Sequence, residues 1–100
     1  SGGANLYPAE IEAELVQHPK VADVAVFGIP NDDWGEEIKA VIQPMEGVEV
    51  GPALTEEIFN WCGERLAKMK TPRTIDYLAE LPRDPNGKLY KRLLKEPYWH

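Results

Sequence analysis

The stretch Val21-Ala-Asp-Val-Ala-Val-Phe-Gly-Ile29 decides how this chain folds. It is rich in β-branched residues and almost entirely apolar after Asp23, which is typical of a strand covered on both faces. We therefore expect residues 21–29 to form the central strand of a sheet, with other elements packed against it.

An amphipathic helix is expected directly before this strand, over residues 8–17. Pro8 suits the first turn of a helix, where its missing N–H has no partner to lose, and Ile11 and Leu15 share one face. The helix should end near His18-Pro19, because proline disfavours a helical conformation in the residue before it. We interpret His18 as a packing residue rather than as a catalyst.

A second strand is expected over residues 37–43, where Ile38, Ala40 and Ile42 alternate with Lys39, Val41 and Gln43 and predict one exposed face. Residues 44–54 contain two prolines and two glycines and predict a loop. Thr55 is a plausible N-cap for a following helix, whose cationic end precedes Pro72. Its apolar face comprises Ile58, Cys62, Leu66 and Met69.

The remaining elements are a third strand over residues 73–78, a proline-rich loop over residues 81–86 and a short helix after Lys88, with Leu89, Leu93 and Leu94 as anchors. The predicted order is α-β-β-α-β-loop-α. This is an α+β fold with a small central sheet of about three strands and helices packed on it. Residues 1–100 are predicted to form one domain.

Charge divides the chain into an acidic body and a basic end. The net charge is −6, which argues against a general nucleic-acid binder. Residues 1–64 hold 13 acidic and 2 basic side chains, whereas residues 65–100 hold 4 acidic and 9 basic ones. That end suits a compact anion such as phosphate or carboxylate, although solvated surface lysines would give the same counts. Its basic residues are Arg65, Lys68, Lys70, Arg73, Arg83, Lys88, Lys91, Arg92 and Lys95.

The sequence argues against a membrane span, a metal site and a phosphate-binding loop in this chain. No run approaches the ~18 apolar residues of a membrane span, and the single cysteine, Cys62, indicates a buried thiol in a reducing compartment such as the cytoplasm. Two histidines and one cysteine show no metal-ligand spacing, and no phosphate-binding loop is present. If the chain is enzymatic, it holds only part of an active site.

Lys88 is the main candidate for chemistry. It follows Asn86-Gly87, and glycine permits the positive φ angle of a turn, so the amine is offered from a loop held by prolines and leucines. Such an amine can neutralise negative charge at a phosphoryl or carboxylate centre, although a surface turn with a solvated lysine is the alternative. Trp34 either covers the end of the sheet or offers a flat apolar surface to a ligand.

The linked segments resemble the C-terminal domain of adenylate-forming acyl-CoA synthetases. They are SGGANLYPAEIEAEL, HPKVADVAVFGIPNDDWGEEIKAVI, KTPR and LPRDPNGKLYKRLL, in the family's order and approximate spacing from Ser1 to about Trp99. The resemblance implies a two-step ligase: a carboxylate and Mg-ATP give an acyl-adenylate and pyrophosphate, and the thiol of coenzyme A then displaces AMP.

The resemblance also implies roles for particular residues. Lys88 matches the family's catalytic lysine, which reaches between the carboxylate and the α-phosphate during adenylation. Other residues match positions that line the pantetheine tunnel or lie near the coenzyme A phosphates in relatives: Gly2, Gly3, Asn5, Trp34, Lys70 and Arg73. No metal ligand is implied in this chain.

The resemblance further implies a partner within the same polypeptide. A large N-terminal domain would bind ATP, magnesium and the acid, and this domain would swing between two poses. We therefore interpret the chain as a fragment that is inactive by itself. The EPYW ending resembles bacterial fatty-acid-type ligases. The alternatives are a non-catalytic binding or assembly domain on the same scaffold, and an adenylation domain that serves a carrier protein.

Overall fold

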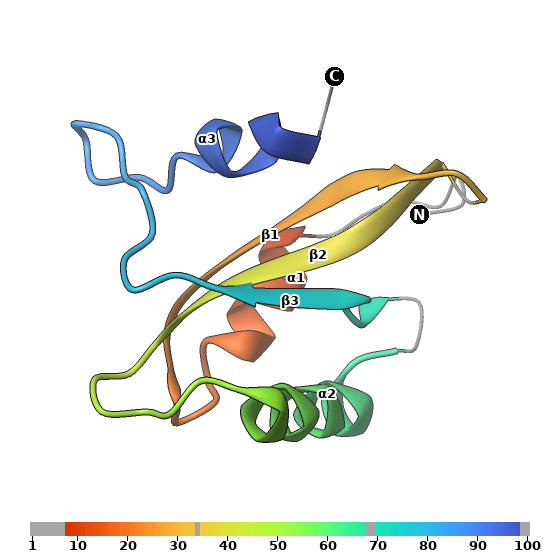
Figure 1. The fold of residues 1–100 in the computed structure, drawn as a ribbon, viewed down its shortest axis with the longest axis vertical. Coiled ribbons are helices and arrows are strands. Elements are labelled where there is room, and N and C mark those ends of the chain that lie inside the picture. The colour runs from red at the N-terminus through yellow and green to blue at the C-terminus, as the bar shows by residue number, and fades with distance from the viewer. Residues whose placement is uncertain (1–7, 34, 68–69, 99–100) are drawn as a thin grey trace.

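The computed structural model describes residues 8–33, 35–67 and 70–98. Along these residues the chain forms α1 (Pro8–Leu15), β1 (Val21–Asn31), β2 (Gly35–Pro44), α2 (Pro52–Arg65), β3 (Thr74–Tyr77), α3 (Lys91–Lys95) and the 3₁₀ turn η2 (Glu96–Tyr98) (Figure 1). The predicted α+β order and three-stranded sheet are confirmed.

The sheet has the order β1-β2-β3, with β1 antiparallel and β3 parallel to β2. The expectation that residues 21–29 form the central strand is therefore wrong, because β2 is central and β1 is an edge. A short turn returns the chain from β1 to β2 as a hairpin, whereas α2 provides the long crossover that a parallel strand requires. That crossover delivers β3 to the free side of β2.

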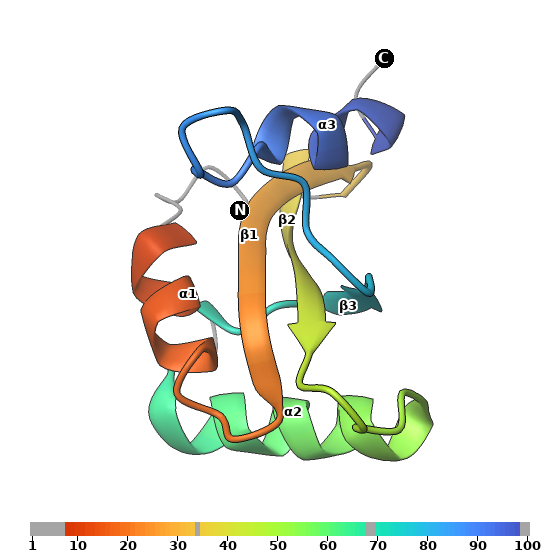
Figure 2. The ribbon, with the colours of Figure 1, turned by 90° about the vertical axis from the view of Figure 1, so that its left-hand side faces the viewer.

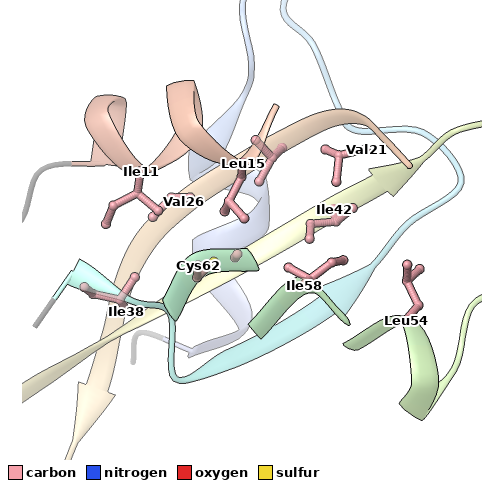
Figure 3. Packing of buried hydrophobic residues seen from close by; sticks show 11 residues of the cluster. Ile11, Leu15, Val21, Val26, Ile38, Ile42, Leu54, Ile58 and Cys62 are labelled. Atoms are coloured by element: carbon pink, nitrogen blue, oxygen red, sulfur yellow. The ribbon is translucent and has the colours of Figure 1, made fainter. Parts of the chain in front are cut away.

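The two faces of the sheet pack against different helices. Figure 2 shows α2 and α3 on opposite sides of the sheet, with α1 beside β1. The larger core lies on the α1 and α2 side (Figure 3) and comprises Ile11, Leu15, Val21, Val24, Val26, Ile38, Ala40, Ile42, Leu54, Ile58 and Cys62. The smaller core, on the α3 side, comprises Ala25, Phe27, Ile29, Val41 and Leu81. Both faces of β1 are thus covered, as its apolar sequence predicts.

A β-bulge near the start of β1 shifts the alternation of side chains. Val21 pairs with Pro44 and Asp23 pairs with Gln43, so the bulged strand holds one extra residue between them. Because of this shift, Val21 shares the larger core with Val24 and Val26.

Lys39 is buried with 6% of its surface exposed, so the predicted half-exposed second strand is wrong. The central position of β2 explains the difference, since helices cover both of its faces. Residues 38–42 are all buried, and the lysine needs a charged partner inside the fold.

The boundaries of α2 also differ from the prediction. The helix begins at Pro52, with Gly51 as its N-cap, so Thr55 is not the cap and residues 52–54 are not loop. Proline at the first helical position has a favourable φ angle, and an earlier start lets Leu54 join the buried face. The helix ends at Arg65, because Leu66 is extended. Met69 lies outside the described residues.

Two smaller predictions are confirmed. Cys62 is fully buried, and burial raises the pKa of its thiol to about 11. His18 is a packing residue: its ring lies 4.8 Å from that of Trp61 in an edge-on arrangement, and its Nε2 lies 2.9 Å from Glu57 Oε2. In the part of the chain that is described, no helix has the length and apolarity needed to cross a bilayer.

Candidate functional site

A tight turn over residues 84–88 carries Lys88. The amide of Gly87 donates to the Asp84 carbonyl at 2.9 Å, and the amide of Asp84 donates to the Lys88 carbonyl at 2.8 Å. Asp84 Oδ1 also accepts from the amides of Asn86 at 2.8 Å and Lys88 at 3.1 Å. Gly87 has a φ of +84°, as the sequence predicts. The turn is therefore closed by its own hydrogen bonds.

The side chain of Lys88 is exposed. The flanking strands of the turn are held together by the Arg83–Leu89 bridge and by the amide of Tyr90, which donates to the Pro82 carbonyl at 2.9 Å. Within the described residues, the ion pairs involve other cations, and the Lys88 amine has no carboxylate partner. The amine is thus available to a ligand or to another domain.

Much of the basic end is neutralised by the acidic body. Lys91 Nζ lies 2.7 Å from Glu12 Oε2, Lys70 Nζ lies 2.9 Å from Glu10 Oε2, and Arg83 pairs with Asp23. Arg65 and Arg92 face Glu64 and Glu96. The cationic field is therefore weaker in the fold than the sequence predicts, because at least four of its nine cations pair with carboxylates of the acidic body.

Lys70 and Arg73 are not brought together with Lys88. The amide of Arg73 donates to the Ile38 carbonyl at 2.8 Å, while the amide of Leu81 donates to Gln43 Oε1 at 2.9 Å. Ile38 and Gln43 are five residues apart on β2, or roughly 17 Å at the usual rise of a strand. The segments before and after β3 accordingly leave it at opposite ends (Figure 1).

Four of the predicted site residues, Gly2, Gly3, Asn5 and Trp34, lie outside the described residues. The hairpin that connects β1 to β2 lies far from the Lys88 turn along β1. Asp23 contacts the base of that turn through Arg83, and the strand ends at Asn31. Asp23 and Asn31 are eight residues apart along the strand, which corresponds to roughly 26 Å.

A polar cluster that the sequence pattern did not predict lies under α3. Lys39 Nζ lies 2.7 Å from Asp76 Oδ2 and 4.9 Å from the centre of the Tyr98 ring, and the Tyr98 hydroxyl donates to Asp76 Oδ2 at 3.0 Å. Partial burial alone would raise the pKa of Asp76, but hydrogen bonds from Lys39 and Tyr98 and the Lys39 charge lower it. The signal that could have revealed the cluster is a lysine within an apolar strand.

A second polar cluster joins the start of β1 to α2. Lys20 Nζ lies 2.8 Å from Glu57 Oε1, and His18 Nδ1 accepts from the Lys20 amide at 3.1 Å. The hydrogen bond from Lys20 lowers the pKa of Glu57, with smaller contributions from His18. Neither cluster provides a metal site: among the described residues, no group of three or more His, Cys, Asp or Glu side chains could hold an ion.

Comparisons with known proteins agree on one family. The sequence profile of the AMP-binding enzyme C-terminal domain matches residues 10–88. The chain is 43% identical over 98 residues to long-chain-fatty-acid–CoA ligase FadD13 of Mycobacterium tuberculosis, covering 98% of this chain and 19% of that protein. It is also 43% identical over 96 residues to 2-succinylbenzoate–CoA ligase of Bacillus cereus, covering 96% of this chain and 19% of that protein.

Solved structures give the same result. Brucella canis acyl-CoA synthetase superposes with a TM-score of 0.92 at 36% identity, covering 98% of this chain and 18% of that one. ATP-bound MatB from Rhodopseudomonas palustris superposes with a TM-score of 0.86 at 36% identity, covering 97% of this chain and 19% of that one. The chain thus spans about a fifth of the length of these relatives.

Proposed function

The chain belongs to the family of AMP-binding enzyme C-terminal domains, and we propose that it is the C-terminal domain of an ATP-dependent acid–thiol ligase. In the first step a carboxylate attacks the α-phosphate of ATP, forming an acyl-adenylate and releasing pyrophosphate. In the second step the thiol of coenzyme A attacks the acyl carbon and AMP leaves. An N-terminal domain of the same polypeptide would bind ATP, magnesium and the acid.

The observation that carries this proposal is the exposed Lys88 amine, which stands on a closed turn and has no carboxylate partner among the described residues. The adenylation step brings a carboxylate and a phosphate together, and their mutual repulsion contributes to the barrier. An ammonium placed between them lowers that barrier, because it interacts most strongly where the negative charges converge. We assign this role to Lys88.

Coenzyme A would use a different part of the domain. We propose that Gly2, Gly3, Asn5 and Trp34 line the path of the pantetheine arm and that Lys70 and Arg73 contact its phosphates. This assignment is supported by a distance: the position on β2 that bonds to Arg73 lies roughly 17 Å along the strand from the position that bonds to the Lys88 loop. Two separate regions of the domain are what a ligase would need if it performs each half-reaction in a different domain pose. When coenzyme A binds, Lys70 would break its ion pair with Glu10 and pair with a phosphate group instead.

We propose a fatty acid as the acyl substrate and the cytoplasm as the location. The name of FadD13 as a long-chain-fatty-acid–CoA ligase supports the choice of a fatty acid. The equal identity to a 2-succinylbenzoate–CoA ligase favours an aromatic acid as a second candidate. Rates of AMP release from the full-length protein with octanoate, palmitate and 2-succinylbenzoate would decide between these substrates.

Lys88→Ala in the full-length protein tests the assigned role. Adenylation, measured as exchange of pyrophosphate into ATP, should fall by about 10² or more. Thioester formation from supplied acyl-adenylate should change by less than about twofold, because that step no longer requires the phosphate and carboxylate to meet. Arg92→Ala is the matched control, since Arg92 is exposed and weakly paired at 3.7 Å. Equal losses in both half-reactions would refute the role of Lys88.

The remaining alternatives have their own readouts. A domain that serves a carrier protein would pass the acyl group to a phosphopantetheinyl protein rather than to free coenzyme A. A non-catalytic binding or assembly domain would show no pyrophosphate exchange in the full-length protein with any of the acids.

A further inference from the structure

We propose that Asp23, Gln43 and Arg83 position the turn that carries Lys88, fixing the direction in which its amine points. This inference rests on the proposed function, because it concerns how Lys88 is presented during adenylation. It assigns to these three residues a role in orienting Lys88 rather than in contacting the nucleotide or the acid.

The turn is attached to the sheet through two residues that face each other on neighbouring strands. The bulge in β1 brings Asp23 opposite Gln43 of β2 in the register of the two strands. A bulge changes the face of the sheet toward which the following side chains point. This bulge follows Val21, whose side chain faces the larger core. Asp23 points to the loop side, where it pairs with Arg83, while Gln43 Oε1 accepts from the Leu81 amide at 2.9 Å. Two neighbouring side chains therefore hold the loop as it leaves the sheet.

Arg83 connects this anchor to Lys88. One guanidinium nitrogen, Nη2, pairs with Asp23, and the other, Nη1, donates to the Gly87 carbonyl at 2.7 Å. That carbonyl belongs to the peptide bond that leads into Lys88. Because the guanidinium is planar and rigid, its two ends fix the distance and angle between β1 and that peptide group.

The turn has few other attachments. Among the described residues, the hydrogen bonds of residues 84–88 run to one another and to Arg83. The flanks are held by buried Leu81 and by Leu89, which packs against the smaller core. Arg83 adds a side-chain link that opposes rotation of the closed turn about these flanks.

The expected effects on stability and on catalysis differ in size. Side-chain exposures of 46% for Arg83 and 21% for Asp23 place this pair near the surface, where an ion pair adds little to stability. Adenylation is more sensitive, because a displacement of about 1 Å at a reacting group costs roughly 10²-fold in rate. Loss of the link should therefore lower the adenylation rate while the protein remains folded.

The test uses Arg83→Gln and Asp23→Asn in the full-length protein, with Arg92→Gln as the matched control. For both variants, we expect kcat for pyrophosphate exchange to fall about tenfold or more. The KM values for ATP and acid and the rate of thioester formation from supplied acyl-adenylate should stay within about twofold. Arg83→Lys should recover part of the loss, since one ammonium can pair with Asp23 but cannot also hold Gly87.

The turn itself provides a second readout. In the 100-residue chain, Arg83→Gln should lower the NMR order parameters of the backbone amides of residues 86–88 and leave those of α2 unchanged. Unchanged order parameters in the turn would overturn the inference, as would a parallel loss of both half-reactions.

Other outcomes separate the two proposals. If Arg83→Gln lowers adenylation and Asp23→Asn does not, Arg83 acts on the ligand directly and the positioning role is wrong. If Lys88→Ala abolishes adenylation while both positioning variants behave as wild type, only this inference fails. If Lys88→Ala itself spares adenylation, the proposed role of Lys88 fails, whatever the order parameters show.

Discussion

The two faces of the sheet differ in the balance of apolar and polar contacts. On the α1 and α2 side, eleven buried apolar residues form the larger core, and the partly exposed pairs Lys20–Glu57 and Lys70–Glu10 add to it. On the α3 side, five buried residues form a smaller core, and polar links secure the covering segment: Arg83 to Asp23, Lys91 to Glu12, and Lys39 to Asp76 and Tyr98.

This difference separates the contacts that stabilise the fold from those that orient the turn with Lys88, the residue proposed to act in adenylation. Burial of apolar surface is non-directional and supplies most of the folding free energy. Ion pairs and hydrogen bonds contribute less to stability but are specific in direction. The polar face carries the turn with Lys88, where direction matters. Three measurements test whether the two faces differ in this way.

The largest effect is expected in the larger core. Ile58 is fully buried, so Ile58→Ala should lower the free energy of unfolding by about 2–5 kcal/mol. Urea denaturation followed by tryptophan fluorescence measures this. Leu93→Ala, on α3 with 49% of Leu93 exposed, should change the value by less than about 0.5 kcal/mol. Similar losses in both variants would remove the distinction between the faces.

Asp76→Asn tests the polar cluster. It leaves the buried ammonium of Lys39 without a carboxylate, and we expect a loss of about 1–2 kcal/mol at neutral pH. The loss should be smaller than for a fully buried pair, because half of the Asp76 side chain is exposed.

The same variant predicts a pH dependence. The pKa of Asp76 is lower in the folded state than its ordinary value of 3.8. Its stabilisation is therefore complete above that value and is lost as the pH falls through the folded pKa. The difference in unfolding free energy between wild type and Asp76→Asn should shrink on acidification, as urea titrations between about pH 2 and pH 7 would show. A constant difference would mean that the Asp76 charge contributes nothing.

The smallest effect is expected from salt. Raising NaCl from about 0.02 M to about 0.5 M screens exposed ion pairs. Native-state hydrogen exchange in residues 89–98 should therefore accelerate by roughly 1.4-fold to fivefold, equivalent to the ~0.2–1 kcal/mol of such pairs. Amides of α2 should change less, because the buried residues Leu54, Ile58 and Cys62 contribute more to holding this helix than its exposed ion pair with Lys20. Equal acceleration in both segments would show that α3 does not depend on its ion pairs.

Local pattern predicted much of the fold. The β-branched run of residues 21–29 is a strand with both faces covered, and the Asn86-Gly87 turn presents an exposed lysine. The pattern could not identify β1 as an edge, since burial by a helix and burial inside a sheet produce the same apolar sequence. It also misjudged Lys39, because alternation of polar and apolar residues does not reveal a buried partner such as Asp76.

The sequence by itself determined the order of elements, the tight turn and the residue types at the candidate site, because these depend on neighbours within a few positions. Only the tertiary structure decided that Asp23 meets Arg83, sixty residues away, and that cations such as Lys70 and Lys91 pair with the acidic body. Such pairings depend on a bulge, a strand register and the docking of a distant loop. These long-range arrangements emerge only when the whole chain is packed.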